Sequence, residues 1–166
     1  IIEERAQNPI HPMVIFYPYE MVSTHDSTVL LSEKTGDLKI QQKGKDGVVL
    51  YVGNCIDTIK DLQETMSAEG LDYSFISCSQ MKPFNVSSLL DKISKFDKIV
   101  TIEENVLNAG FGSIISEILH DHNLNKSLIR IGLDCKFVKP GNKIDLTKSN
   151  KIDADSIIKS IHKKWG

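Results

Sequence analysis

Apolar residues along this chain form short continuous runs that alternate with longer stretches of helical spacing, and this rhythm begins at Val48. The runs are rich in β-branched and aromatic residues, which is typical of buried strands. They occupy residues 48–52, 73–77, 99–102 and 128–131. Strands that alternate with helices predict an α/β domain with a mainly parallel sheet, covered by helices on both faces.

Between these runs, apolar residues recur every three or four positions, as on the inner face of a helix. We expect the first helix to have Asn54 as its N-cap and Gly70 at its C′ position. Asn85 is expected to cap a second helix, and residues 112–120 to form a third. The helices therefore fall between successive strands, as parallel pairing requires.

The remaining segments have weaker patterns. Leu38–Gln42 alternates between apolar and polar residues, which predicts a half-exposed edge strand. Residues 135–150 have no period and predict an irregular segment. A last helix should open at Asp153 or Asp155, because either carboxylate suits a helix N-terminus.

Composition narrows the class of protein. The chain has 166 residues and a formal net charge of −2, which gives no electrostatic case for nucleic acid or a membrane surface as a partner. No apolar run is long enough to span a bilayer. Its three cysteines, Cys55, Cys78 and Cys135, are odd in number and widely spaced. We expect reduced thiols in a cytoplasmic protein rather than a disulfide framework or a zinc site.

The first part of the chain differs from the rest. Residues 13–17 are apolar and end at Pro18, whereas residues 21–34 are polar and have no period, so we interpret them as a linker. The chain begins with Ile rather than Met, and we expect it to be a piece of a longer protein.

Two adjacent carboxylates, Glu103 and Glu104, follow the third strand and precede Asn105. This places them at the carboxyl edge of the sheet, where open α/β folds usually bind ligands. A carboxylate pair can act in acid–base catalysis if one pKa is raised. However, adjacent residues leaving a strand point apart. We favour the interpretation that one Glu accepts hydrogen bonds from backbone amides and the other meets a basic partner.

A small-residue turn, Gly110-Phe111-Gly112, leads into the third helix. Such a turn can cradle a phosphate. It lacks the dinucleotide-binding fingerprint and the lysine of a P-loop, and nearby carboxylates would repel an anion. We favour a tight turn with close helix packing, which glycine permits.

Other candidate chemistry is weaker. His120 and His122 are two positions apart and do not face each other on a helix, and Cys78 has no nearby His to activate it. We therefore assign no catalytic, cofactor-binding or metal-ligating residue in this chain. The candidates for an interface or regulatory site are Glu103, Glu104, Asn105, Gly110, Phe111 and Gly112.

The order of segments resembles the carboxyl-terminal domain of the transketolase family, which includes transketolase, 1-deoxyxylulose-5-phosphate synthase and the β-subunits of 2-oxo acid dehydrogenase E1. Family members carry a glycine before an apolar strand, then K-P-hydrophobic-D/N, V-T-hydrophobic-E-E and G-hydrophobic-G-S. The matching residues here are 36–40, 44–54, 70–72, 81–85, 99–105 and 110–113.

The resemblance implies a three-layer α/β/α sandwich over residues 36–166 in which the edge strand Leu38–Gln42 is antiparallel. Residues 1–20 are similar to the tail of the preceding pyrimidine-binding domain, and 21–35 would be the linker. That tail often ends in Y-P-R-G, and Tyr19 stands here in place of the arginine that contacts substrate phosphate in several members.

The resemblance also implies thiamine diphosphate and Mg²⁺ in the full-length enzyme, bound by earlier domains, and ketol or aldehyde group transfer. This fragment would hold no cofactor and have no activity alone, but would give dimer contacts and structural support. Its partners would be the preceding domains or a partner subunit, in a homodimer. Two alternatives stay open: a freestanding small-ligand-binding or regulatory module, and the end of an E1 β-subunit.

Overall fold

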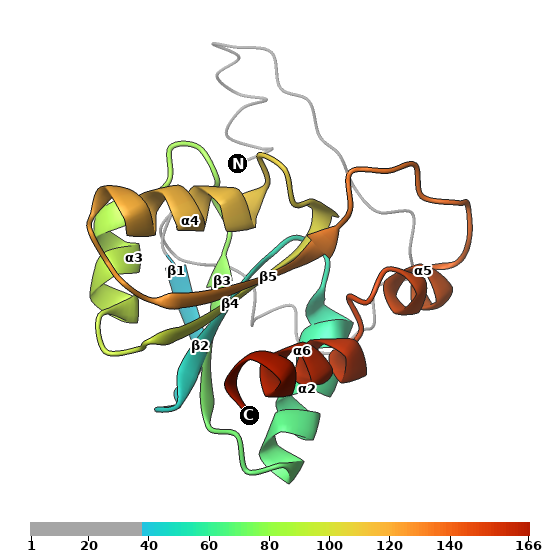
Figure 1. Cartoon of the computed structure of the whole chain (residues 1–166), viewed down its shortest axis with the longest axis horizontal. Coiled ribbons are helices and arrows are strands. Elements are labelled where there is room, and N and C mark those ends of the chain that lie inside the picture. Colours follow the sequence, from blue (N-terminus) through green and yellow to red (C-terminus); the bar gives the residue numbers. More distant parts are fainter. Residues whose placement is uncertain (1–37) are drawn as a thin grey trace, which may run out of the picture. The chain divides into compact units, whose positions relative to one another are not determined.

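The computed structural model describes residues 38–166, which form a five-stranded sheet between two layers of helices (Figure 1). The strands lie in the order β1-β3-β2-β4-β5. β2, β3, β4 and β5 pair in parallel, whereas β1 at the edge pairs antiparallel with β3. The bounds of the strands are β1 Leu38–Gln42, β2 Gly47–Val52, β3 Tyr73–Cys78, β4 Lys98–Val106 and β5 Ser127–Leu133. The parallel sheet with one antiparallel edge strand is confirmed.

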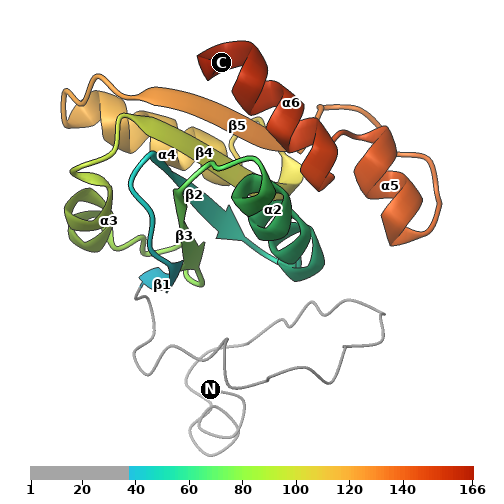
Figure 2. The same cartoon turned by 90° about the horizontal axis from the view of Figure 1, so that it is seen from below.

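Helices cover both faces of the sheet, which confirms the predicted three-layer α/β/α sandwich (Figure 2). Side chains of α2 and α6 pack on one face, and those of α3 and α4 pack on the other. α5 contributes no buried residue to either layer. The bounds of the helices are α2 Ile56–Ala68, α3 Val86–Ile93, α4 Phe111–Asp121, α5 Lys143–Ser149 and α6 Ala154–Trp165.

The central strand β2 shows why the apolar runs are continuous. Val49 and Tyr51 point into the core under α2 and α6, whereas Val48 and Leu50 point into the core under α3 and α4. Successive side chains of a strand face opposite sides of the sheet, so a strand covered on both faces needs an apolar residue at every position.

Three expectations about helix ends hold and one is wrong. Gly70 follows Glu69, the C-cap residue of α2, and therefore occupies the predicted C′ position, with a φ of 73°. The Asn85 side chain accepts a hydrogen bond from the amide of Ser88, and Asp153 caps α6 in the same way through Ser156. Asn54 is not the cap of α2: the helix begins one residue later, with Cys55 at the N-cap position and no side-chain hydrogen bond there.

Two other segments differ from the sequence prediction. β4 does not end at Ile102 but continues to Val106, so Glu103, Glu104 and Asn105 lie within the strand rather than in a turn. Residues 135–150 are not wholly irregular, because Asn142 caps a short helix, α5, by accepting a hydrogen bond from the amide of Asp145.

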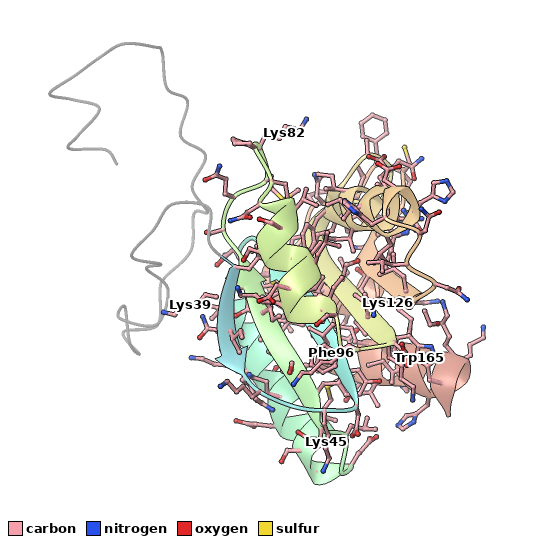
Figure 3. The ribbon with its side chains drawn as sticks, turned by 90° about the vertical axis from the view of Figure 1, so that its left-hand side faces the viewer. Lys39, Lys45, Lys82, Phe96, Lys126 and Trp165 are labelled. Atoms are coloured by element: carbon pink, nitrogen blue, oxygen red, sulfur yellow. The ribbon has the colours of Figure 1, made fainter. Side chains whose placement is uncertain are left out.

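At the amino edge of the sheet, long side chains make hydrogen bonds to neighbouring segments. Figure 3 shows Phe96, Lys126 and Trp165 at this end of the sheet. The Lys126 ammonium donates to the carbonyls of Ser94 and Phe96, at 3.1 and 2.7 Å. The Trp165 indole donates to the Ser127 hydroxyl at 2.8 Å. This end of the sheet is therefore tied internally, and the candidate site lies at the opposite, carboxyl edge.

The expected domain tail at residues 1–20 and the linker at 21–35 lie outside the described residues. Over residues 38–166, no helix combines the length and the apolar character needed to cross a membrane.

Candidate functional site

The carboxyl half of β4 directs its two glutamates to opposite faces of the sheet. Glu103 is buried, with 1% of its surface exposed, and its carboxylate reaches the start of α4. Glu104 is half-buried and meets Lys143 of α5. Because the two carboxylates point apart, they do not form the close pair that acid–base catalysis by coupled carboxylates requires.

Glu103 closes the N-terminus of α4. Its two carboxylate oxygens accept hydrogen bonds from the amides of Phe111 and Gly112, each at 2.8 Å. The N-cap residue Gly110 has no side chain to do this, and the first amides of a helix have no partner within the helix. A carboxylate there satisfies two donors and interacts favourably with the helix dipole.

The turn lies so close to β4 and β5 that two of its positions have room only for glycine. A Cβ atom at Gly110 would collide with the Glu103 carboxylate and the Val106 carbonyl. A Cβ atom at Gly112 would lie 2.7 Å from the Thr101 hydroxyl oxygen and 2.9 Å from Cδ of Arg130. The turn therefore packs against the sheet, and its amides hold the protein's own carboxylate in the position that a bound phosphate would take.

On the other face, Lys143 joins two neighbouring strand ends. Its ammonium donates to the carbonyl of Asn54, which follows β2, at 2.6 Å, and lies 3.6 Å from the Glu104 carboxylate of β4. The chain leaves β2 toward one helical layer and β4 toward the other. Open α/β sheets usually bind their ligands at such a point, and here a lysine of the same chain bridges it.

The cysteines near this edge are not activated as nucleophiles. Burial, together with the nearby charge of Glu104, raises the pKa of the Cys55 thiol to about 12. Burial raises the pKa of the Cys78 thiol to about 12 as well. Since the thiolate is the reactive form, both side chains behave as small apolar residues at neutral pH. All three cysteines are free thiols in this structure.

The other candidates of the edge have structural partners. The Asn105 side chain accepts a hydrogen bond from the amide of Val106 at 2.8 Å. The Phe111 ring packs against Phe84 of the loop between β3 and α3, with ring centroids 6.3 Å apart. In the part of the chain that the structure describes, no three His, Cys, Asp or Glu side chains gather as metal ligands would.

The sequence pattern predicted Glu103, Glu104 and the glycine turn at one edge of the sheet but gave no indication that Lys143 lies there. Lys143 is 39 positions beyond Glu104, in a segment without a periodic pattern. The available signal was the sequence Asn142 followed by Asp145, which suits the start of a helix.

The fold and the site define an α/β domain in which charged side chains of the same chain, Glu103 and Lys143, occupy the carboxyl edge of the sheet. The chain belongs to the family described as the C-terminal domain of transketolase, whose model matches residues 36–157. The resemblance in the order of its motifs is thereby confirmed.

Curated relatives carry the name 1-deoxy-D-xylulose-5-phosphate synthase. That of Caldanaerobacter subterraneus subsp. tengcongensis is 26% identical over 160 residues, which cover 96% of this chain and 26% of the relative. That of Dictyoglomus thermophilum is 32% identical over 107 residues, which cover 64% of this chain and 17% of the relative. This chain thus spans about a quarter of the length of the first of these relatives.

A solved structure named "Split gene transketolase, inactive beta4 tetramer" is similar in fold. It superposes with a TM-score of 0.71 at 18% sequence identity, and the match covers 80% of this chain and 43% of that chain. At this identity the likeness supports the fold, and it agrees with the family match.

Proposed function

We propose that this chain is the C-terminal domain of a thiamine diphosphate-dependent enzyme that transfers ketol or aldehyde groups. In this role it supports the active-site halves and contributes to a homodimer, and it is inactive alone. The family match over residues 36–157 is the observation that carries this proposal. The names of the curated relatives favour the 1-deoxyxylulose-5-phosphate synthase branch.

The carboxyl edge supports a structural role. Glu103 is engaged with the α4 amides, and Lys143 joins Asn54 to Glu104. We propose that Asn105, which is exposed, and Glu104, which is half-buried, lie near contacts with other domains or a partner subunit. Glu103 and the glycine turn are buried and support this edge of the sheet from within. The three free thiols favour a reducing compartment, and we propose that the enzyme acts in the cytoplasm.

Calorimetry tests this proposal. We expect no binding when thiamine diphosphate with Mg²⁺ is titrated into the 166-residue chain, and tight binding by the full-length enzyme. Tight binding by the 166-residue chain alone would contradict the proposal. The coding sequence upstream of Ile1 should encode the G-D-G motif of the family's diphosphate site, and a start codon directly before Ile1 would instead favour a freestanding module.

A second arrangement is favoured by one comparison. The solved structure of similar fold is named as a split gene transketolase, so its chain is one part of an enzyme encoded in pieces. The cofactor site of the present enzyme would then lie on a separate subunit, as in an E1 β-subunit. Co-purification with a second polypeptide carrying the G-D-G motif distinguishes this arrangement from a single chain.

A further inference from the structure

Residues 134–151, which make up most of the connection between β5 and α6, contain three of the four exposed large apolar side chains of the described structure; we call this segment the α5 arm. Phe137 is fully exposed, and 67% of Ile144 and 37% of Val138 are exposed. Across residues 38–166 the fourth exposed large apolar side chain is Ile40, in the edge strand. Contiguous exposed apolar patches mark protein interaction sites, and the concentration of these side chains in one segment makes the α5 arm the candidate for one.

The α5 arm is not part of the domain core. Its helix has no buried residue, and both views place α5 beyond the end of α6, outside the two helical layers (Figures 1 and 2). A helix of two turns is marginal in water unless packing supports it. In the described structure Lys143 holds it to Asn54 and Glu104, so polar contacts rather than apolar burial fix its place.

The α5 arm is also basic. It contains five lysines and two aspartates, a net charge of +3, whereas the whole chain has a net charge of −2. Lys136 pairs with Asp134, and Lys143 is engaged with Glu104. Lys139 and Lys148 are exposed and make no ion pair with another residue of the range 38–166. Positive charges around apolar side chains fit a partner surface that is acidic around an apolar centre.

We propose that the α5 arm is the surface by which this domain docks onto the rest of its own enzyme, against an apolar patch with an acidic rim. This inference rests on the proposed function. This chain spans about a quarter of the length of a curated relative. The other domains of an enzyme of that size must therefore contact this domain through some part of its surface. Phe137 and Ile144 are the anchors, and Lys139 and Lys148 steer and orient the contact.

Docking by the α5 arm also gives Glu104 a role. Lys143 joins the arm to Glu104, so the orientation of the arm depends on an ion pair at the carboxyl edge. Glu104 is then a positioning residue for the interface rather than a contact itself. This explains how a carboxylate directed away from Glu103 contributes to assembly.

Hydrogen exchange on the full-length enzyme and on the 166-residue chain tests the proposal. Amides of the α5 arm should exchange rapidly in the 166-residue chain and at least ~10-fold more slowly in the enzyme, where the arm is covered. The double substitution Phe137→Asp/Ile144→Asp should abolish this protection, and Lys139→Glu/Lys148→Glu should reduce it most at low salt. Ile40→Ser, which removes the exposed apolar side chain outside the arm, is the matched control and should leave the protection intact.

Two results would contradict docking by the α5 arm. Equal exchange of the α5 arm in the chain and in the enzyme would overturn the proposal. So would self-association of the 166-residue chain that Phe137→Asp/Ile144→Asp abolishes, because the occupant would then be a second copy of this domain. In the 166-residue chain the double substitution should not change the melting temperature, since both side chains are exposed. Turnover of the unmodified enzyme with thiamine diphosphate tests the proposed function separately.

Discussion

At the scale of single residues, Glu103 shows how a buried charge is tolerated. A carboxylate removed from water is costly unless it is hydrogen-bonded, and this one accepts two charge-assisted hydrogen bonds from the first amides of α4. Its neighbour Glu104 is half-exposed and pairs with Lys143 over a longer distance. The two adjacent glutamates should therefore differ sharply in what they contribute to stability.

Glu103→Gln should lower the free energy of unfolding by about 2 kcal/mol, the value of a hydrogen bond to a charged group. In the glutamine side chain an NH2 group replaces one carboxylate oxygen. This donor would then point at the backbone N–H of Phe111 or Gly112, which is also a donor. Glu104→Gln should change stability by no more than about 1 kcal/mol, because a partly exposed ion pair is screened by water. Urea unfolding of the 166-residue chain measures both.

The two single substitutions control for each other, since each removes one negative charge from β4. Both variants are expected to fold, and the double substitution should cost little more than Glu103→Gln alone. An equal cost for both would show that Glu103 is not specifically engaged with α4.

The buried acidic groups predict the response to alkaline pH. Unfolded thiols ionise near 9.0, whereas burial holds the pKa of Cys55 and of Cys78 at about 12. Between these values the unfolded state binds fewer protons than the folded state, so the free energy of unfolding falls as pH rises. Below about pH 8 these thiols contribute no pH dependence.

Thermal unfolding at about pH 8 and about pH 10 should show this loss, and Cys78→Ala should reduce its pH dependence. Burial also raises the pKa of Tyr51 to about 12, so part of the loss should persist in that variant. A thiol reagent should label exposed Cys135 in the folded chain and all three cysteines only after unfolding. Rapid labelling of Cys55 in the folded chain would contradict this assignment.

For these residues, the sequence predicted which way each side chain points better than it predicted which residue each one contacts. Because a strand alternates its side chains, the two glutamates had to point apart, and this is what β4 shows. The sequence could predict that Glu103 accepts hydrogen bonds from backbone amides, since a helix begins directly after the turn. It could not predict which amides these are. Lys143 was not foreseeable, because its distance in sequence gives no contact information and its segment has no apolar period.

At the scale of elements, the errors have physical causes. The sequence prediction ended the third parallel strand at Ile102 because charged residues usually end a buried run. β4 continues because Glu103 is satisfied by α4 and because Leu107 donates its amide to the Leu133 carbonyl just beyond the ladder, at 2.9 Å. α5 was missed because a helix with no buried residue shows no amphipathic pattern.

The packing of α4 against β4 can be tested at Gly112. Gly112→Ala should destabilise the domain by about 1–3 kcal/mol, because the added methyl group overpacks the contact with Thr101 and Arg130. Gly141→Ala is the matched control: the nearest atom to its Cβ would be 3.4 Å away, on the Leu146 side chain. Thermal unfolding of both variants measures the difference. A neutral Gly112→Ala would mean that α4 can shift away from the sheet freely.

At the scale of the whole molecule, the alternation of apolar runs and helical stretches was sufficient to predict the layers and the parallel sheet. The direction of β1 came from the resemblance to a family rather than from its pattern, because an alternating strand of five residues fits either direction. The proposed docking surface could not be predicted from the sequence, because the exposure of Phe137 and Ile144 follows from the path of the chain after β5.

The cooperativity of the fold is tested by Ile102→Asp. Ile102 is fully buried in β4, between β2 and β5 and under α2 and α6. A carboxylate there would be buried without a partner, and we expect the domain to lose its cooperative thermal transition. Circular dichroism during heating measures this. A folded variant with an unchanged melting temperature would contradict the position of this side chain in the core.

The carboxylate of Glu103 can be regarded as an internal ligand of the domain, bound where proteins of other families bind an anion from solution. Shortening it in Glu103→Ala would leave the amides of Phe111 and Gly112 without an acceptor in a cavity of carboxylate shape. Formate supplied in the buffer should then occupy this cavity and recover part of the lost melting temperature, in proportion to its concentration, while chloride should recover less. The same fold thus contains, one substitution away, a receptor for small carboxylates.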